Sequence, residues 1–268
     1  YIRRRSPAAV IAELRDVRNH WGLDQVRFSD DHFALDARWL RQFLALYKAE
    51  IGRPFTVNAR ADSLDEEKIA LLADAGCRLV CFGIETGRQE LRDRVLRKNI
   101  SDDAILRVAS QLKKHRIRFL TSNIIGLPGE TAADAWTTIN LNQKIGTDLP
   151  WYSMMQYYPG TQIYQAAREQ GLLPENFDME RVGSYFNNDY LRQKNLPELR
   201  NIHCFSILTS RYPRLTPLVR WLAPRVPPNP LFRLIFKLSY LHLTWRRAGL
   251  RLGRLLAGWR IYGRHLFR

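Results

Sequence analysis

The stretch Arg118-Phe-Leu-Thr-Ser-Asn-Ile-Ile-Gly-Leu-Pro-Gly-Glu-Thr131 decides the fold of this 268-residue chain. Its first eight residues form a mostly apolar run that predicts a strand, and the run breaks at Gly126 in a turn shaped by Pro128 and Gly129. Glycine lets backbone come close to a ligand, and α/β proteins place binding sites at the carboxyl ends of strands. The stretch therefore predicts a strand that leads into a ligand-binding turn and then a helix.

Four further strand-like runs alternate with helical patterns along the chain. Strands are expected at residues 25–29, 55–58, 79–83, 118–125 and 151–157, and helices are expected to begin near residues 7, 36, 65, 89, 102, 132 and 160, with Ser6, Ser101 and Thr131 as caps. The first helix has one apolar face formed by Val10, Ile11, Leu14, Val17 and Trp21, and the second turns Leu40, Phe43, Leu44 and Tyr47 inward. Strands that alternate with helices pair in parallel through right-handed crossovers. The sequence thus predicts the α/β class, as a partial (β/α)6 TIM-like barrel with strands 2–6 present. Because the chain opens on a helix and at Tyr1 rather than Met, we expect a fragment whose first strand precedes Tyr1.

Charge divides the chain after Glu198, its last acidic residue. Of the 42 Lys and Arg residues, 14 lie beyond that point, so this tail carries +14 of the net charge of +16. A break of this kind is a domain signal. We expect a barrel over residues 1–175 and a helical, Arg-rich region over residues 176–268.

Composition also bears on the compartment. Three cysteines are too few for a disulfide framework, and the Arg-rich start leads into an amphipathic helix rather than the apolar core of a signal peptide. No uncharged run approaches the roughly 18 apolar residues of a membrane span. These features predict a cytoplasmic protein, with peripheral attachment to the inner face of the membrane left open by the tail.

Polar residues gather where the expected strands end. They are Asp30, Asp31, Asn58, Arg60, Glu85, Ser122, Asn123, Gln156 and Tyr158. In a parallel barrel all these ends lie on one rim, which is the functional face. Strand ends also meet solvent and are polar for that reason alone. Agreement among five strand ends favours a site.

Two of these positions have distinct alternatives. Asp30 and Asp31 could bind a cation or accept hydrogen bonds from an ammonium group, or they could be a capping pair ahead of the helix at Asp36. Glu85 follows an apolar strand and lies between Gly83 and Gly87. A carboxylate there could accept hydrogen bonds from ribose hydroxyls or a salt bridge from a ligand amine.

The cysteines and histidines show no metal pattern. Cys77 follows a helix-ending glycine and Cys81 lies within a strand, so we expect them on different elements and both structural. The six histidines have no ligand spacing, and no Ser-His-Asp set, phosphate-binding loop or Rossmann fingerprint is present. These classes of site are not indicated.

The tail predicts an amphipathic helix. Arg233, Lys237, Thr244, Arg247, Arg251 and Arg254 fall on one side, and Leu234, Leu238, Leu241, Trp245, Leu252, Leu256 and Trp259 occupy much of the remainder. Residues 231–259 could therefore meet a membrane surface, where basic side chains gain from anionic lipid. The alternatives are a helix docked on the barrel with a solvated basic face, or a nucleic-acid patch. We expect no nucleic-acid partner.

Several segments together resemble the radical S-adenosylmethionine superfamily over residues 1 to about 175. They are Tyr1-Ile-Arg-Arg-Arg-Ser-Pro7, Phe28-Ser-Asp-Asp-His-Phe33, Asn58-Ala-Arg-Ala-Asp62, Ala75-Gly-Cys-Arg78, Gly83-Ile-Glu-Thr-Gly87 and Ile125-Gly-Leu-Pro-Gly-Glu-Thr131. The resemblance is to the branch with a cobalamin-binding domain ahead of the barrel, and members similar to this chain include anaerobic magnesium-protoporphyrin IX monomethyl ester cyclase and carbon methylases.

The resemblance implies a cofactor set and binding roles. In this family a 4Fe-4S cluster, held by three cysteines, reduces S-adenosylmethionine to a 5′-deoxyadenosyl radical. Asp30 and Asp31 would then lie near the methionine amino group, and Glu85 would reach the ribose or the methionyl end. Asn58 and Arg60 belong to the same rim. The ribose and adenine would meet Ser122, Asn123, Ile125, Gly126 and the backbone near Tyr157 and Tyr158.

The chain departs from the family at one point. The family's Cys-x3-Cys-x2-Cys motif is absent, and none of Cys77, Cys81 and Cys204 lies in a suitable loop. The family pattern places the motif shortly before the Arg-Arg-Ser-Pro segment, so we expect it upstream of Tyr1, in a parent protein that could also carry cobalamin. The alternative is a relative that lacks the cluster.

The resemblance predicts an enzyme that methylates, cyclises or rearranges an apolar or large organic substrate. The substrate would be a small or lipid-like molecule, and a flavodoxin or ferredoxin would supply electrons. A cluster-free barrel acting as a membrane-surface or interaction module is the alternative. A lyase or aldolase would need a Lys or metal set on the rim, and Lys is absent from the expected strand ends.

Overall fold

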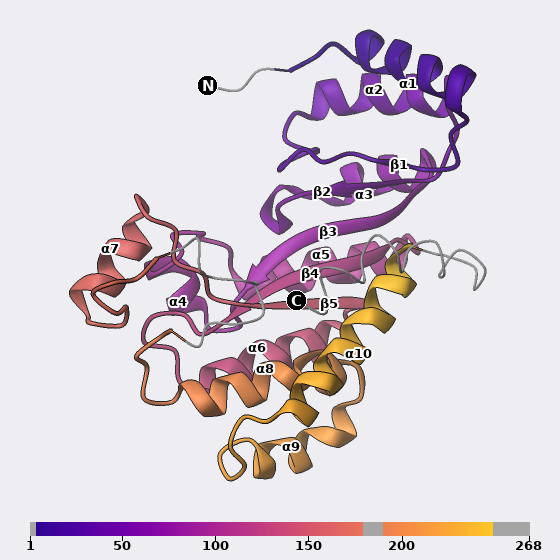
Figure 1. Ribbon diagram of the computed structural model, residues 1–268. Coiled ribbons are helices and arrows are strands. Elements are labelled where there is room, and N and C mark those ends of the chain that lie inside the picture. Colours follow the sequence, from indigo (N-terminus) through magenta and orange to yellow (C-terminus); the bar gives the residue numbers. More distant parts are fainter. Residues whose placement is uncertain (1–3, 179–189, 249–268) are drawn as a thin grey trace. The chain divides into compact units, whose positions relative to one another are not determined.

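The computed structural model describes residues 4–178 and 190–248 of the chain (Figure 1). Its strands are β1 Val26–Arg27, β2 Phe55–Asn58, β3 Cys77–Glu85, β4 Arg118–Ile125 and β5 Leu149–Met154. Its first helices are α1 Pro7–Trp21, α2 Ala37–Glu50, η1 Ala61–Ser63, α3 Glu66–Asp74, α4 Gln89–Arg94, α5 Asp102–Lys114, α6 Ala132–Ile145 and α7 Gln162–Glu169. The C-terminal helices are α8 Leu196–Arg211, η3 Pro213–Leu215, α9 Thr216–Leu222 and α10 Pro230–Ala248.

The described strands form one sheet in the order β1-β2-β3-β4-β5. β1 pairs with β2, and β2 with β3, in parallel; Val26 lies opposite Phe55, and Asn58 lies opposite Cys81. The predicted α/β class is confirmed, as are the five strands in chain order expected for a partial barrel. A further strand ahead of Tyr1 stays a prediction.

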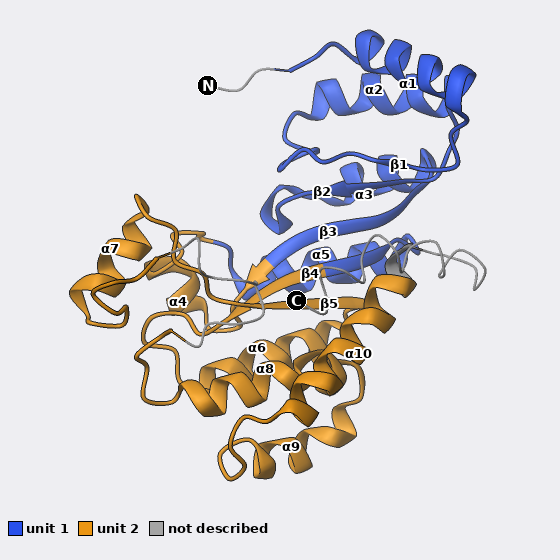
Figure 2. Ribbon diagram, viewed as in Figure 1, with its two compact units in different colours: residues 1–83, 100–120 blue, residues 84–99, 121–268 orange. Residues whose placement is uncertain are grey.

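The chain divides into two compact units (Figure 2). Unit 1 comprises residues 1–83 and 100–120, and unit 2 comprises residues 84–99 and 121–268. β3 and β4 each begin in unit 1 and end in unit 2. The domain boundary predicted near residue 175 stays a prediction.

Unit 1 is held together by a cluster of aromatic side chains, which we call the aromatic core. It comprises Phe28, Phe33, Trp39, Phe43, Tyr47 and Phe55, whose ring centroids lie 4.8–6.5 Å apart in edge and stacked pairs. Each buried aromatic ring stabilises the fold by about 1.5–3 kcal/mol through removal from water, and ring pairs add roughly 0.5–1.5 kcal/mol. The aromatic core therefore supplies much of the free energy that folds this unit.

The helices of unit 1 begin where the sequence predicts. The hydroxyl of Ser6 accepts a hydrogen bond from the amide of Ala9 at the start of α1, and α2 buries the predicted Leu40, Phe43, Leu44 and Tyr47. One expectation for α1 is wrong. Trp21, expected on the inward face, is 85% exposed because it occupies the last turn, and among the residues of α1 only Ile11 is buried.

Unit 2 is built around α6, which buries eight of its residues. α8 packs against both α6 and β5, and α10 packs against α8 and β5. In Figure 1, α8 lies beside α6, and α10 runs from α8 to β5. α6 begins in a capping box, because Thr131 and Asp134 exchange hydrogen bonds between side chain and backbone, and this confirms the predicted cap.

Two boundaries differ from those predicted. Cys77 lies on β3 together with Cys81, not on a separate element, because the strand begins directly after the turn at Gly76. β5 ends at Met154, so Tyr157 lies in the loop that follows rather than within the strand. Both cysteines are buried and neither forms a disulfide, as expected for a structural role.

Candidate functional site

The turn after β4 is stabilised by hydrogen bonds to the carboxyl group of Glu130. Its Oε2 accepts hydrogen bonds from the amides of Gly126, at 2.5 Å, and Leu127, at 3.2 Å. Gly126 and Gly129 have φ angles of 90° and 74°, which favour glycine. The backbone carbonyl of Glu130 in turn accepts hydrogen bonds from the side chains of Gln193 and Asn195. The Gly-Leu-Pro-Gly-Glu sequence thus specifies a fixed turn.

Burial dominates the electrostatics of Glu130, which is 1% exposed. Loss of solvation raises the pKa of this carboxyl to about 8, against the effect of the two amide hydrogen bonds. The group is therefore mostly protonated at neutral pH. Its Oε1 has no hydrogen-bond partner among the described residues, so the carboxyl serves the turn through Oε2.

The end of β3 is strained and charged. Glu85 has a φ of 65°, which costs a non-glycine residue roughly 1–2 kcal/mol, and such strain is found at functional sites. Its carboxylate forms an ion pair with Lys98 at 2.5 Å, and the side chains are 19% and 17% exposed. Lys98 does not follow a strand in the sequence, but the segment after α4 returns it to Glu85 at the end of β3.

Glycine is required at the next turn for a different reason. A Cβ on Gly87 would lie 2.5 Å from the carbonyl oxygen of Thr137, within α6. The amide of Gly87 donates a 2.8 Å hydrogen bond to the hydroxyl of Thr138. Gly83-Ile-Glu-Thr-Gly87 therefore fixes the end of β3 directly on α6.

An ion pair also joins the segment after β3 to α6. Arg88 lies 2.7 Å from Asp134. Partial burial acts to raise the pKa of Asp134, but hydrogen bonds from Thr131 and Arg88 outweigh it and hold that pKa below its usual value.

Alternation along β4 separates the predicted binding residues into two faces. Asn123 and Ile125 are buried, whereas Ser122 and Ile124 are half-buried on the opposite face. The amide of Asn123 donates to the carbonyls of Thr121 and Trp151, and its oxygen accepts from Asn142. This geometry gives the Asn123 side chain a structural task and leaves Ser122 on the open face.

The loop after β5 returns to the same turn. The hydroxyl of Tyr157, which is fully buried, donates to the carbonyl of Gly126 at 3.4 Å, and the amide of Met155 donates to the carbonyl of Ile125 at 2.8 Å. Tyr158 is 43% exposed. Unit 2 therefore brings together the predicted residues of β4 and of the segment after β5 through backbone contacts.

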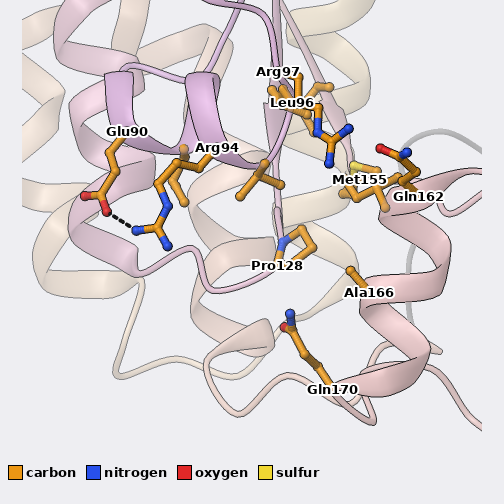
Figure 3. Close-up of a pocket in the computed structure, with 13 residues that line it drawn as sticks. Glu90, Arg94, Leu96, Arg97, Pro128, Met155, Gln162, Ala166 and Gln170 are labelled. Atoms are coloured by element: carbon orange, nitrogen blue, oxygen red, sulfur yellow. Dashed lines mark hydrogen bonds and ion pairs between the residues drawn. The ribbon is translucent and has the colours of Figure 1, made fainter.

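A cavity of about 550 Å³ opens at these strand ends (Figure 3). Its walls are α4 with the segment that follows it, Ile124, Pro128, Met155 and one side of α7. Most of the lining is apolar, and its polar groups come from Glu90, Arg94, Arg97, Gln162 and Gln170. Arg94 forms an ion pair with Glu90. This volume is typical of a small-molecule site.

None of the eleven predicted binding residues lines this cavity, although several are next to residues that do. Ile124 lies between Asn123 and Ile125, and Met155 lies two positions before Tyr157. Selection by polarity missed these residues because they are apolar. The period-two alternation of β4 was the available signal, since it places Ser122 and Ile124 on one face.

Four predicted binding residues, Asp30, Asp31, Asn58 and Arg60, lie in unit 1. The side-chain amide of Asn58 donates to the carbonyl of Asp30 at 3.1 Å, and this joins the ends of β1 and β2. Asp30 and Asp31 are exposed. α2 is capped by Asp36, so the capping alternative for the aspartate pair does not hold.

Arg60 is engaged within unit 1. It forms two hydrogen bonds to Asp62, at 3.1 and 2.8 Å, and these lower the pKa of that carboxyl. The hydroxyl of Ser63 donates to the Arg60 carbonyl and lies 2.6 Å from Nε2 of His32. Burial, followed by the charge of Arg60, lowers the pKa of His32. The binding role of the four predicted residues of unit 1 stays a prediction.

The described residues do not fit an iron–sulfur cluster. Across residues 4–178 and 190–248 no group of three His, Cys, Asp or Glu side chains could hold a metal ion. Burial raises the pKa of Cys77 to about 12 and that of Cys204 to about 11, so both remain protonated thiols, which are poor ligands. We therefore derive no step through a cluster.

Comparison with known proteins identifies the class. The family model of the radical SAM superfamily matches residues 1–141, which is just over half of the chain. The chain belongs to the radical SAM superfamily, as the segments from the Arg-Arg-Arg-Ser-Pro start to the Gly-Leu-Pro-Gly-Glu turn predict.

Curated relatives carry methyltransferase names. The chain is 27% identical over 165 residues to an uncharacterized methyltransferase of Pyrococcus horikoshii, covering 61% of this chain and 36% of that protein. It is 23% identical over 192 residues to the cytidylyl-2-hydroxyethylphosphonate methyltransferase of Streptomyces wedmorensis, covering 68% and 35%. The chain thus spans about a third of the length of these relatives.

A solved structure shares the fold. The radical S-adenosylmethionine methyltransferase TsrM from Kitasatospora setae, with cobalamin and a 4Fe-4S cluster bound, superposes with a TM-score of 0.56 at 20% identity. The match covers 62% of this chain and 34% of that one.

Proposed function

We propose that unit 2 binds the adenosine part of S-adenosylmethionine at the ends of β3, β4 and β5, and that the complete protein uses this molecule to methylate a carbon centre. The observation that carries the proposal is the cavity bounded by Ile124, Pro128 and Met155, directly beside the turn held by Glu130. Apolar walls suit a planar base, and Gly129, the exposed residue of the segment Gly126–Glu130, offers backbone to its polar edge.

The paired charges at the end of β3 fit the same ligand. The carboxylate of Glu85 is held by Lys98 on a strained backbone, so its position is fixed before any ligand arrives. A fixed carboxylate accepts hydrogen bonds from two ribose hydroxyls or from an ammonium group. We assign Glu85 to that task and Ser122, on the open face of β4, to contact with the nucleoside.

Methylation is favoured over cyclisation or rearrangement by the names of the relatives. The substrate would be an apolar or large organic molecule, lipid-like among others, and a flavodoxin or ferredoxin would supply electrons. The similarity to ester cyclases and the use of cobalamin belong to this proposal too. Placement of the cluster cysteines ahead of Tyr1 stays a prediction, which the upstream coding sequence tests.

The binding proposal is tested by filling the cavity from one side of α7. Ala166 lines the cavity and its neighbour Gln165 is exposed and does not, so Ala166→Phe and Gln165→Phe add the same ring at adjacent positions of one helix, about 100° apart around its axis. We expect Ala166→Phe to weaken S-adenosylmethionine binding, measured by equilibrium dialysis, by about tenfold or more, because about 1.4 kcal/mol of lost contact is tenfold. Gln165→Phe should bind as the parent does.

Equal affinity in both variants would place the ligand elsewhere. Glu85→Gln extends the test, with Glu66→Gln as its control, because Glu66 pairs with Lys114 on an exposed surface. We expect weaker binding only for Glu85→Gln.

The cluster-free module is a second candidate, favoured by the lack of a metal-binding group in the described ranges. One measurement on the complete protein distinguishes the radical enzyme from the cluster-free module. Anaerobic reconstitution with iron and sulfide gives the absorption of a 4Fe-4S cluster in the enzyme and none in the module.

A further inference from the structure

α10 has two apolar faces, and only one of them is packed. On the packed face Phe232 lies 4.7 Å from Phe205, and Phe236 lies 4.3 Å from His203, both on α8. Tyr240 lies 4.7 Å from Trp151 on β5, and Leu243 is 4% exposed. The docked-helix alternative is thus correct for this face.

The opposite face carries a second stripe of large apolar residues, which we call the outer stripe. It comprises Leu231, Leu234, Leu238, Leu241 and Trp245, spaced alternately three and four residues apart. At about 100° per residue this spacing forms one line along the helix, directly opposite the packed face. Leu231, Leu234 and Leu238 are 62%, 47% and 58% exposed, and the other two are half-buried.

Exposed leucines in a line indicate a partner. The charges beside the outer stripe indicate which partner. Arg233 and Lys237 flank it on one side, and α10 has no acidic residue, nor has any position after Glu198. The stripe therefore presents leucines beside cationic side chains, in a region whose formal charge is +14.

We infer that the outer stripe of α10 docks on an anionic lipid surface. Leucines and a tryptophan enter the boundary between headgroups and acyl chains, while Arg233 and Lys237 remain with the phosphates. No helix in the described part of the chain is long and apolar enough to cross a bilayer, so the helix would lie on the surface. This inference goes beyond the proposed function and does not depend on it.

A second copy of the chain is the competing occupant, because the spacing of the outer stripe is also that of a coiled-coil seam. Charge argues against it. Two α10 helices would bring Arg233 and Lys237 of each copy beside a seam on which neither copy offers an acidic partner. Anionic lipid carries negative charge, whereas a second α10 carries none.

The exposures along α10 show which residues of the predicted membrane-binding segment face outward. The predicted membrane-binding segment was residues 231–259, of which residues 249–259 lie outside the described residues. Within the described part, the leucines rather than the basic side chains occupy the centre of the outward face.

Vesicle flotation of the full chain tests the inference. Vesicles contain phosphatidylglycerol with phosphatidylcholine, or phosphatidylcholine alone. We expect Leu234→Gln/Leu238→Gln to lower partitioning onto anionic vesicles by about tenfold or more, because each leucine loses apolar burial. The matched control is Leu35→Gln/Leu46→Gln, two exposed leucines of unit 1, which should partition as the parent does.

A charge variant separates the two contributions. Arg233→Gln/Lys237→Gln should weaken binding to anionic vesicles by roughly fivefold or more and leave weak binding to phosphatidylcholine unchanged, since each basic residue contributes about 1 kcal/mol. Nonspecific hydrophobic adsorption would instead give the parent and the charge variant equal binding to both kinds of vesicle, with no dependence on phosphatidylglycerol.

Two results would overturn the inference. One is equal flotation of the parent and the Leu234→Gln/Leu238→Gln variant. The other is a parent that does not float but forms a dimer in sedimentation equilibrium, which the leucine variant dissociates. The second result would assign the stripe to a second copy of the chain.

Discussion

Unit 1 and unit 2 are both strand-and-helix structures, but their interiors differ in chemistry. Unit 1 is filled by the aromatic core around Phe43 and Phe55. Unit 2 buries a polar network in which Asn142 accepts hydrogen bonds from Thr121 and Thr147 and donates to Asn123 and Thr138. Apolar packing tolerates rearrangement, whereas a buried polar network must be satisfied at every atom.

The difference indicates which backbone segments are positioned most strictly. The polar network joins β4 to α6, and the turn at Gly126 continues directly from β4. Directional hydrogen bonds fix the strand and therefore its end, which is what a binding turn requires.

The largest expected effect tests that contrast. Asn142→Leu keeps the volume of the side chain but leaves Thr121, Thr147 and Asn123 without their partner, at a cost of about 3–5 kcal/mol in the free energy of unfolding. Phe43→Leu, the matched change in unit 1, should cost about 1–2 kcal/mol. Chemical denaturation followed by circular dichroism measures both. Equal costs would remove the distinction between the two interiors.

The second effect is a pH dependence centred on Glu130. Its carboxyl titrates near 4.5 in the unfolded chain and near 8 in the folded one, so the folded chain retains a proton between these values. Rising pH through this window therefore weakens folding, by up to about 5 kcal/mol at roughly 1.4 kcal/mol per pKa unit, and the loss levels off above pH 8.

Glu130→Gln removes this titration and keeps an oxygen for the amides of Gly126 and Leu127. Burial lowers the pKa of His203 to about 4, and this weakens folding as pH falls below about 6.5, so a single curve mixes the two groups. The difference between parent and variant at each pH isolates Glu130. A constant difference from pH 5 to 8 would contradict the raised pKa.

The third effect concerns the close contact at the end of β3. Gly87→Ala places a Cβ against the backbone of α6 and should cost about 1–3 kcal/mol. Gly129→Ala, where nothing lies within 4 Å of the added atom, should cost about 1 kcal/mol for its positive φ alone. Thermal unfolding compares them, and a costlier Gly129→Ala would mean that α6 can move aside.

The smallest effect checks the correction to α1. Trp21→Ala should change the free energy of unfolding by less than about 0.5 kcal/mol, because the ring is 85% exposed. A loss of 2 kcal/mol in denaturation would restore the inward position that the sequence indicates.

Local signals in the sequence predicted most of the fold. Ser6, Asp36, Ser101 and Thr131 were expected to begin helices, and each side chain accepts the capping hydrogen bond. Such signals lie within a few residues of one another and need no tertiary information.

The site was less predictable because it depends on residues far apart in the chain. The sequence indicated Glu85, but nothing local pairs it with Lys98, thirteen residues later. It also indicated Asn123, whose partner Asn142 lies on α6 and directs the side chain inward. Polarity alone does not distinguish a ligand contact from a satisfied buried group.

The central claim is that S-adenosylmethionine binds at the ends of β3, β4 and β5 in unit 2. Hydrogen exchange of the full chain, with and without saturating S-adenosylmethionine, tests it most directly. We predict slower exchange at residues 84–87, 124–130 and 155–161, and no change in α9, which lies away from these strand ends in the chain. Unchanged exchange at all three segments would contradict the account.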